Sequence, residues 1–158
     1  MWRVILGVIG GTLVFLLGFV LGAEYLLSGI PAFLVLIFLG ILASMGVGIV
    51  SASLMVLAKR SQPVLTLYGL AASLLAGSVF SVDQLPDFLQ ALSWAIPHTY
   101  VINSARYVLM ADPGSFYIPF GSAVVALLIF NLVMYTVGLW LFSRALQYAR
   151  KMGMLSGY

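Results

Sequence analysis

The sequence predicts an all-α membrane protein with four transmembrane helices and an outer, re-entrant helical hairpin between the third and the fourth. Two observations support this fold class. Only 7% of the residues are charged, whereas 63% are hydrophobic and the mean hydropathy is +1.17. Four charge-poor runs also approach or exceed the about 20 helical residues that cross roughly 30 Å of hydrocarbon. A water-soluble domain with this composition would lack the polar residues needed to cover its surface.

The predicted spans cover about residues 4–27, 32–58, 63–80 and 119–146, within a single domain of residues 1–158. Pro31 and Pro63 suit the first turns of the second and third helices, where a missing backbone N–H costs nothing. The first run is longer than the core of a secretory signal and no clear cleavage site follows it. We therefore interpret it as a retained span.

The positions of the basic residues predict the orientation, because Lys and Arg next to spans are retained on the cytoplasmic side. With both termini in the cytoplasm of a multi-pass protein of the cell (inner or plasma) membrane, six basic residues lie inside: Arg3, Lys59, Arg60, Arg144, Arg150 and Lys151. Arg106 and all four acidic residues then lie outside. The basic balance is thus explained by topology, and no basic cluster with interleaved aromatics indicates nucleic-acid binding.

Several kinds of chemistry are excluded by what the sequence lacks. It has no cysteine and a single histidine, His98, so disulfides, thiolate nucleophiles and a metal site built from these residues are not expected. No Gly-x-x-x-x-Gly-Lys-Ser/Thr loop for nucleotide phosphates is present. We expect no catalytic residue, and we interpret His98 as an interfacial or packing residue rather than a catalytic base.

Small residues predict how the spans pack, because in lipid they let helix backbones approach closely. The second span carries such residues at a spacing of three or four: Gly40, Ser44, Gly48 and Ser51. Simple helix packing is the favoured interpretation of this stripe, and a sliding seam in a moving transporter is the alternative. Asn131, central in the last span, is interpreted as an interhelical hydrogen-bond donor, with substrate contact as the alternative.

The region of about residues 84–110 predicts two short helices, neither long enough to cross a bilayer. In the first piece Pro86 fits the opening turn and Asp83 is a candidate cap. Its apolar residues recur at helical spacing and predict one apolar face: Leu85, Phe88, Leu89 and Leu92.

Pro97 opens the second piece, in which Thr99, Asn103 and Arg106 align at i, i+4 and i+7 on one polar face. An unpaired Arg106 at mid-membrane would cost about 2.5–3.5 kcal/mol, so we expect it to meet outer water, a carbonyl or an acid. Glu24 is a candidate acid for such a pair, although a solvated Glu24 is the simpler expectation. Broken backbone at membrane depth also predicts that this hairpin packs against protein.

The hairpin resembles that of the type-2 ABC exporter permeases. The matching residues are Ala76-Gly77, Phe80, Leu85-Pro86, Phe88-Leu89, Ile96-Pro97-His98-Thr99-Tyr100 and Arg106, within a signature that covers residues 69–106. Two positions depart from the family pattern, since Ser81 stands where Pro is frequent and His98 where Leu or Phe is common. The family normally has six spans and a coupling helix, so the chain resembles the C-terminal two-thirds of a permease, as a fragment or a split-gene product.

The resemblance implies a membrane subunit of an ABC exporter that moves a hydrophobic or amphipathic solute, such as a drug, a lipid or a lipid-linked saccharide, outward. It implies a second permease copy, contact with membrane lipid and a separate ABC ATPase that binds ATP and Mg, with no cofactor on this chain. By resemblance, the third span lines the path with Leu70, Ser73, Leu74 and Gly77, and Val79 with Phe80 forms an outer plug. A non-transporting membrane scaffold derived from a truncated permease is the alternative function, and an ion channel lacks a filter motif.

Overall fold

A computed structural model describes residues 13, 17–21, 26–58, 62–78, 81–110 and 116–151. These residues are mostly helical, and no strand occurs among them. The named elements are η1 (Leu27–Gly29), α2 (Ile30–Ala58), α3 (Gln62–Leu75), η2 (Val82–Gln84), α4 (Asp87–Ser93), α5 (Pro97–Leu109) and α6 (Phe120–Lys151). Most of the first predicted span, together with Glu24, Lys59 and Arg60, lies outside the described residues.

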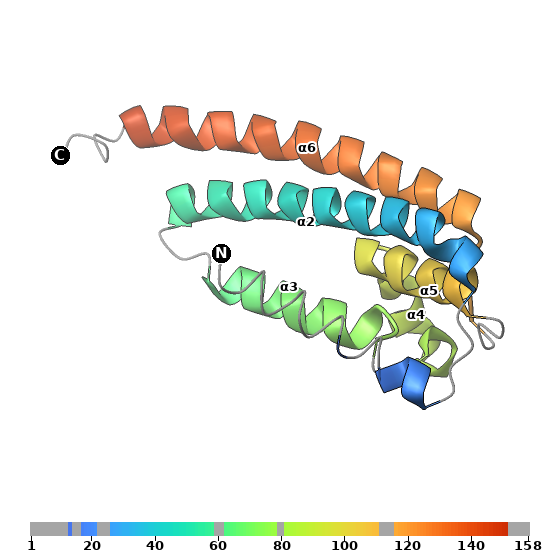
Figure 1. Ribbon diagram of the computed structural model, residues 1–158. Coiled ribbons are helices and arrows are strands. Elements are labelled where there is room, and N and C mark those ends of the chain that lie inside the picture. Colours follow the sequence, from blue (N-terminus) through green and yellow to red (C-terminus); the bar gives the residue numbers. More distant parts are fainter. Residues whose placement is uncertain are drawn as a thin grey trace.

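The two longest helices, α2 and α6, lie side by side along most of their lengths (Figure 1). The segments Leu27–Val56 and Phe120–Tyr148 are both long and apolar enough to cross a membrane. Many of their large side chains point outward, as Phe38 does with 62% of its surface exposed and Leu132 with 71%. Helices that are apolar on nearly all sides are typical of a membrane environment, so the chain is a membrane protein.

The α2–α6 interface is built from apolar side chains and two close backbone approaches. A Cβ atom on Gly46 would lie 2.9 Å from Cβ of Met134, and one on Gly138 would lie 3.1 Å from Cγ2 of Ile49. Asn131 on α6 donates from Nδ2 to the Leu39 carbonyl on α2 at 3.2 Å. The interhelical hydrogen bond predicted for Asn131 is therefore present.

The close packing does not follow the stripe that the sequence predicts. Gly48 has no atom within 4 Å of a potential Cβ, and Ser44 turns its hydroxyl back onto the Gly40 carbonyl at 2.9 Å. Gly40 does lie in a tight contact, but with Val101 of α5 rather than with α6. The spacing of small residues thus marked α2 as a helix with close contacts, but it did not indicate which residue meets α6. That residue is Gly46, two positions before Gly48.

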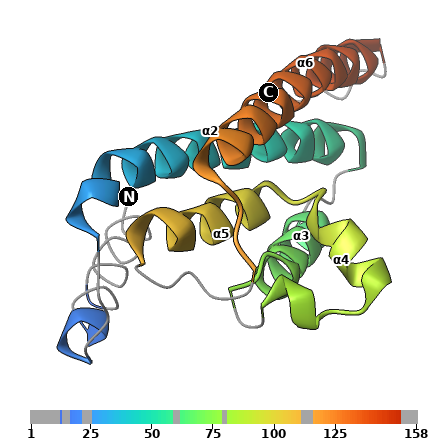
Figure 2. The same cartoon turned by 90° about the vertical axis from the view of Figure 1, so that its right-hand side faces the viewer.

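Helix α3 is short and packs mainly on the hairpin helices α4 and α5. Its 14 residues extend over only about 21 Å. The predicted span continues to Phe80, but the helix ends at Leu75, and Val79 and Phe80 lie outside the described residues. Figure 2 shows α3 and α4 together on one side of α5, away from α6.

The hairpin has the two short helices predicted, with two differences in detail. Pro86 occupies the N-cap position of α4 rather than its first turn, and its own side chain makes no capping hydrogen bond. Leu85 and Leu89 pack against a buried cluster with α3, whereas Phe88 is 76% exposed. The helix has only 7 residues, or about two turns. Its apolar residues therefore do not form the single buried face predicted: some pack against α3, and others point away from the protein.

Candidate functional site

The candidate site lies at the C-terminal end of α3. Gly77 follows the last helical turn with φ +83°, a left-handed conformation that favours glycine over residues with a side chain. A Cβ there would also lie 3.2 Å from Oδ1 of Asn103 and 3.1 Å from Cγ2 of Val82. Gly77 therefore ends the helix and allows α5 to approach the broken backbone.

Side chains of α5 bind the carbonyl oxygens that the broken helix leaves without helical partners. Asn103 donates from Nδ2 to the Ala76 carbonyl at 3.2 Å, and Arg106 donates from Nη2 to the Gly77 carbonyl at 2.7 Å. Asn103 is fully buried. Because an unsatisfied backbone group costs several kcal/mol where no water is present, these two bonds explain how α3 can end there. We call them the α3 latch.

The polar face predicted on α5 thus points into the protein. Thr99, fully buried, donates from Oγ1 to the Ser93 carbonyl at 2.7 Å and so closes the turn between α4 and α5. Tyr100 donates from its hydroxyl to the Trp94 carbonyl at 2.9 Å across the same turn. Thr99 and Tyr100 hold the hairpin together, whereas Asn103 and Arg106 hold it to α3. The expected contact of Arg106 with a carbonyl is present.

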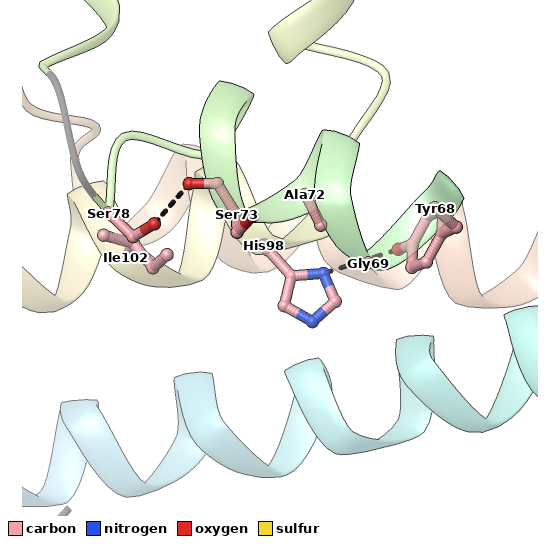
Figure 3. A pocket seen from close by; sticks show the side chains of 7 residues that line it. All are labelled: Tyr68, Gly69, Ala72, Ser73, Ser78, His98 and Ile102. Atoms are coloured by element: carbon pink, nitrogen blue, oxygen red, sulfur yellow. Dashed lines mark hydrogen bonds between the residues drawn. The ribbon is translucent and has the colours of Figure 1, made fainter. Parts of the chain in front are cut away.

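A pocket of about 270 Å³ lies between α3 and α5. Its described lining residues come from α3, from the segment after its end and from the start of α5, and none of these carries an ionised side chain at neutral pH. They are Tyr68, Gly69, Ala72, Ser73, Ser78, His98 and Ile102 (Figure 3). Ser78 belongs to this wall because the turn at Gly77 brings its hydroxyl back to the Ser73 carbonyl, to which it donates.

Tyr68 and His98 face each other across the pocket. The Tyr68 hydroxyl lies 3.4 Å from Nδ1 of His98, a long hydrogen bond, and the two rings meet edge to face with centroids 6.1 Å apart. Burial lowers the pKa of His98 below its ordinary value of 6.5, because a low-dielectric environment disfavours the charged imidazolium. His98 is therefore neutral at physiological pH.

The path residues predicted on α3 are divided between this pocket and an apolar groove. Ser73 lines the pocket, whereas Leu70 and Leu74 line the groove, whose volume is about 530 Å³. The groove is completed by Leu67, Ala71, Leu75, Leu85 and Leu89. Gly77 lines neither cavity and shapes the end of α3 instead.

Sequence reasoning missed Tyr68 and Ser78 as members of the site. Tyr68 lies 30 positions before His98, and no local pattern connects the two residues. Ser78 enters the site only through the left-handed turn at Gly77. An Ala-Gly pair at the end of an apolar run was the one available signal for that turn.

The site offers hydrogen bonds and apolar surface rather than acid–base or metal chemistry. Within the described ranges, no three metal-ligating side chains come together. Three buried polar atoms in those ranges have no hydrogen-bond partner, namely Oδ1 of Asn103, Oγ of Ser104 and Oδ1 of Asn131, and none of these residues lines the pocket.

Comparison with known proteins agrees with the signature at this site. The model of a family described as ABC-2 type transporter matches residues 1–110, which include α3, the latch and the hairpin. Comparison with curated proteins and with solved structures found no match.

Proposed function

This chain belongs to the ABC-2 type transporter family, and from that premise we propose that it is the permease subunit of an ATP-driven exporter. In this proposal it moves a hydrophobic or amphipathic solute out of the cytoplasm. The family match supports a permease over a non-transporting scaffold. Drugs, lipids and lipid-linked saccharides remain the candidate solutes.

The proposed topology has four spans and a re-entrant hairpin, in the cell membrane with both termini in the cytoplasm. The contacts of α5 along α2 support the hairpin. Val108 lies against Gly29 and Val101 lies against Gly40, so α5 runs antiparallel to α2. Of the residues of α5, the first one, Pro97, is therefore the farthest from the outer end of α2. The contacts between α5 and α2 thus extend over the 11 positions from Gly29 to Gly40, which correspond to about 16 Å along the helix axis.

The observation that supports a solute path is the pair of cavities on α3. An apolar groove with Leu70 and Leu74 and a pocket with hydroxyl and imidazole groups lie on the same short helix. An amphipathic solute needs both kinds of surface, since ligand sites are mostly apolar with a few placed polar groups. In the proposal α3 therefore carries the solute-facing residues.

Energy must be supplied by a partner in this proposal. The chain has no phosphate-binding loop, and its two lysines, Lys59 and Lys151, are not part of one. An ABC ATPase with bound ATP and Mg would move α3 relative to the longer helices, with two permease copies around a central path. Contact with lipid is expected over the exposed apolar faces of α2 and α6.

The experiment that tests the proposal is ATP-dependent flux. The full chain is purified with the ABC ATPase encoded nearest to its gene, reconstituted into phosphatidylcholine vesicles and assayed with Nile red, an uncharged amphipathic dye. Leu74→Trp, which fills the groove, should lower ATP-dependent flux several-fold, whereas Leu128→Trp on an exposed face of α6 should not. No copurifying ATPase, or copurification without ATP-dependent flux of any amphipathic probe, would favour the scaffold.

A further inference from the structure

The pocket between α3 and α5 has a chemistry that restricts what it can bind. Its polar groups are the Tyr68 hydroxyl, the Ser73 and Ser78 hydroxyls and the His98 imidazole. Among the described residues that line the pocket, none is an acid, a lysine or an arginine. An unpaired charge there would be unfavourable, because these residues offer no opposite charge.

The hydrogen bonds already made within the pocket determine which of its polar groups can still donate to a ligand and which can still accept from it. The Ser73 hydroxyl donates to the Leu70 carbonyl at 2.9 Å and the Ser78 hydroxyl donates to the Ser73 carbonyl, so both oxygens keep acceptor capacity only. When the Tyr68 hydroxyl donates to Nδ1 of His98, the imidazole proton resides on Nε2. That nitrogen points away from Tyr68 (Figure 3), and in this tautomer it can donate a hydrogen bond to a ligand.

A ligand group that satisfies this pocket must both accept and donate hydrogen bonds while remaining uncharged. A hydroxyl does both, whereas a phosphate or carboxylate only accepts and an ammonium only donates. The volume of about 270 Å³ holds a group of several heavy atoms rather than one water molecule, whose share of liquid volume is about 30 Å³. A sugar ring combines the required size with several hydroxyls.

We propose that this pocket binds an uncharged, polyhydroxylated head group, such as a glycosyl unit, and discriminates against anionic head groups. The inference rests on the proposed function in taking this head to be part of the transported solute. Tyr68 and Ser73 accept hydrogen bonds from the ligand hydroxyls, and Nε2 of His98 donates one.

The test measures lipid retention by the full chain and needs neither ATP nor an ATPase. The chain is placed in phosphatidylcholine nanodiscs with equal amounts of monoglucosyl diacylglycerol and phosphatidylglycerol of the same acyl chains. Native mass spectrometry after mild delipidation should show more glucosyl lipid retained than phosphatidylglycerol. Tyr68→Phe, Ser73→Ala and His98→Phe should each lower that preference about fivefold, the effect of one hydrogen bond.

Ser143→Ala is the matched control, because that hydroxyl donates to the Leu139 carbonyl on α6, outside the pocket. Equal retention of the two lipids, a preference for phosphatidylglycerol, or a glucosyl preference unchanged in all three pocket variants would each overturn the proposal. If methyl β-glucoside displaces the lipid, the head group alone suffices and a free sugar is the source. If it does not, the ligand is a glycolipid. A negative result here leaves ATP-dependent flux of the uncharged dye Nile red unaffected, so the two proposals fail separately.

Discussion

The α2–α6 pair, against which α5 also packs, and the unit formed by α3 and α4 are held together by different forces. Between α2 and α6 the contacts are mostly apolar and run along two helices of 29 and 32 residues, around a cluster that includes Leu36 and Leu127. Asn131 and Tyr135 of α6 add hydrogen bonds to carbonyls inside α2, which keep their own helical partners. The α3 unit has its own smaller cluster around Leu75 and Ile96. It depends in addition on side-chain bonds to the broken backbone at Ala76 and Gly77.

This difference indicates which part can move. Apolar packing distributed over many residues resists displacement, whereas a short helix joined through a few polar bonds can rearrange when those bonds are exchanged. The α2–α6 pair is therefore suited to be a scaffold. The α3 unit, which carries both cavities, is suited to be the moving part of a transporter.

The largest expected effect is at Gly29, where the segment before α2 meets α5. A Cβ there would overlap the Val108 carbonyl, and because that atom is backbone, no rotamer change can relieve the overlap. Gly29→Ala should lower the free energy of unfolding by about 3 kcal/mol. Gly48→Ala, with nothing within 4 Å, should leave it unchanged or raise it. Denaturant unfolding in micelles measures both, and equal losses would contradict the contact.

The second prediction concerns the α3 latch. Arg106→Ala leaves the Gly77 carbonyl without its partner and should cost about 1.5–3 kcal/mol, the range for a hydrogen bond to a charged group. Hydrogen exchange should then increase at the end of α3 and not in the middle of α6. Arg144→Ala is the control in the other region, since Arg144 lies over the Trp140 ring at 5.3 Å and should cost about 0.5–1 kcal/mol. Faster exchange throughout α2 and α6 would show that the two regions are not separable.

The third prediction compares the buried asparagine of the α2–α6 interface with the one that binds the end of α3. Asn131→Leu should cost about 0.6 kcal/mol, because the Leu39 carbonyl lies inside α2 and keeps its helical partner. Asn103→Leu should cost about 1–2 kcal/mol, because the Ala76 carbonyl lies past the end of α3. Thermal unfolding of the two variants in the same detergent tests the order. If Asn131→Leu is the more damaging, the polar latch is not what distinguishes the α3 unit.

The smallest expected effect is the pH dependence at His98, on α5 outside the spanning helices. Since burial lowers its pKa, the unfolded chain binds more protons than the folded one just below the ordinary value of 6.5. Stability should therefore be complete above that pH and fall as the pH decreases through it. The melting temperature should drop by a few degrees from pH 7.5 to pH 5.5, and His98→Phe should remove most of the drop. A drop of the same size in His98→Phe would assign it to other groups.

Features that depend on residues within one segment could be predicted from the sequence, whereas features that depend on contacts between distant segments could not. The helices over 32–58 and 119–146 were predictable, because span length and hydropathy are local properties of the sequence. The short helix α5 was predictable from Pro97 and the spacing of Thr99, Asn103 and Arg106 for the same reason. The division of Ser73 from Leu70 and Leu74 was not, because it depends on where α4 and α5 meet α3.

By itself the sequence determined that this chain is a helical membrane protein with a polar face on a broken hairpin, and it indicated the transporter family. Hydropathy and residue spacing are sufficient for these conclusions, since they act within one segment. Only the tertiary structure decided what the polar face binds, because the carbonyls of Ala76 and Gly77 are 27 and 29 positions away from Asn103 and Arg106. The pocket of Tyr68 and His98 likewise exists only once α5 folds back against α3.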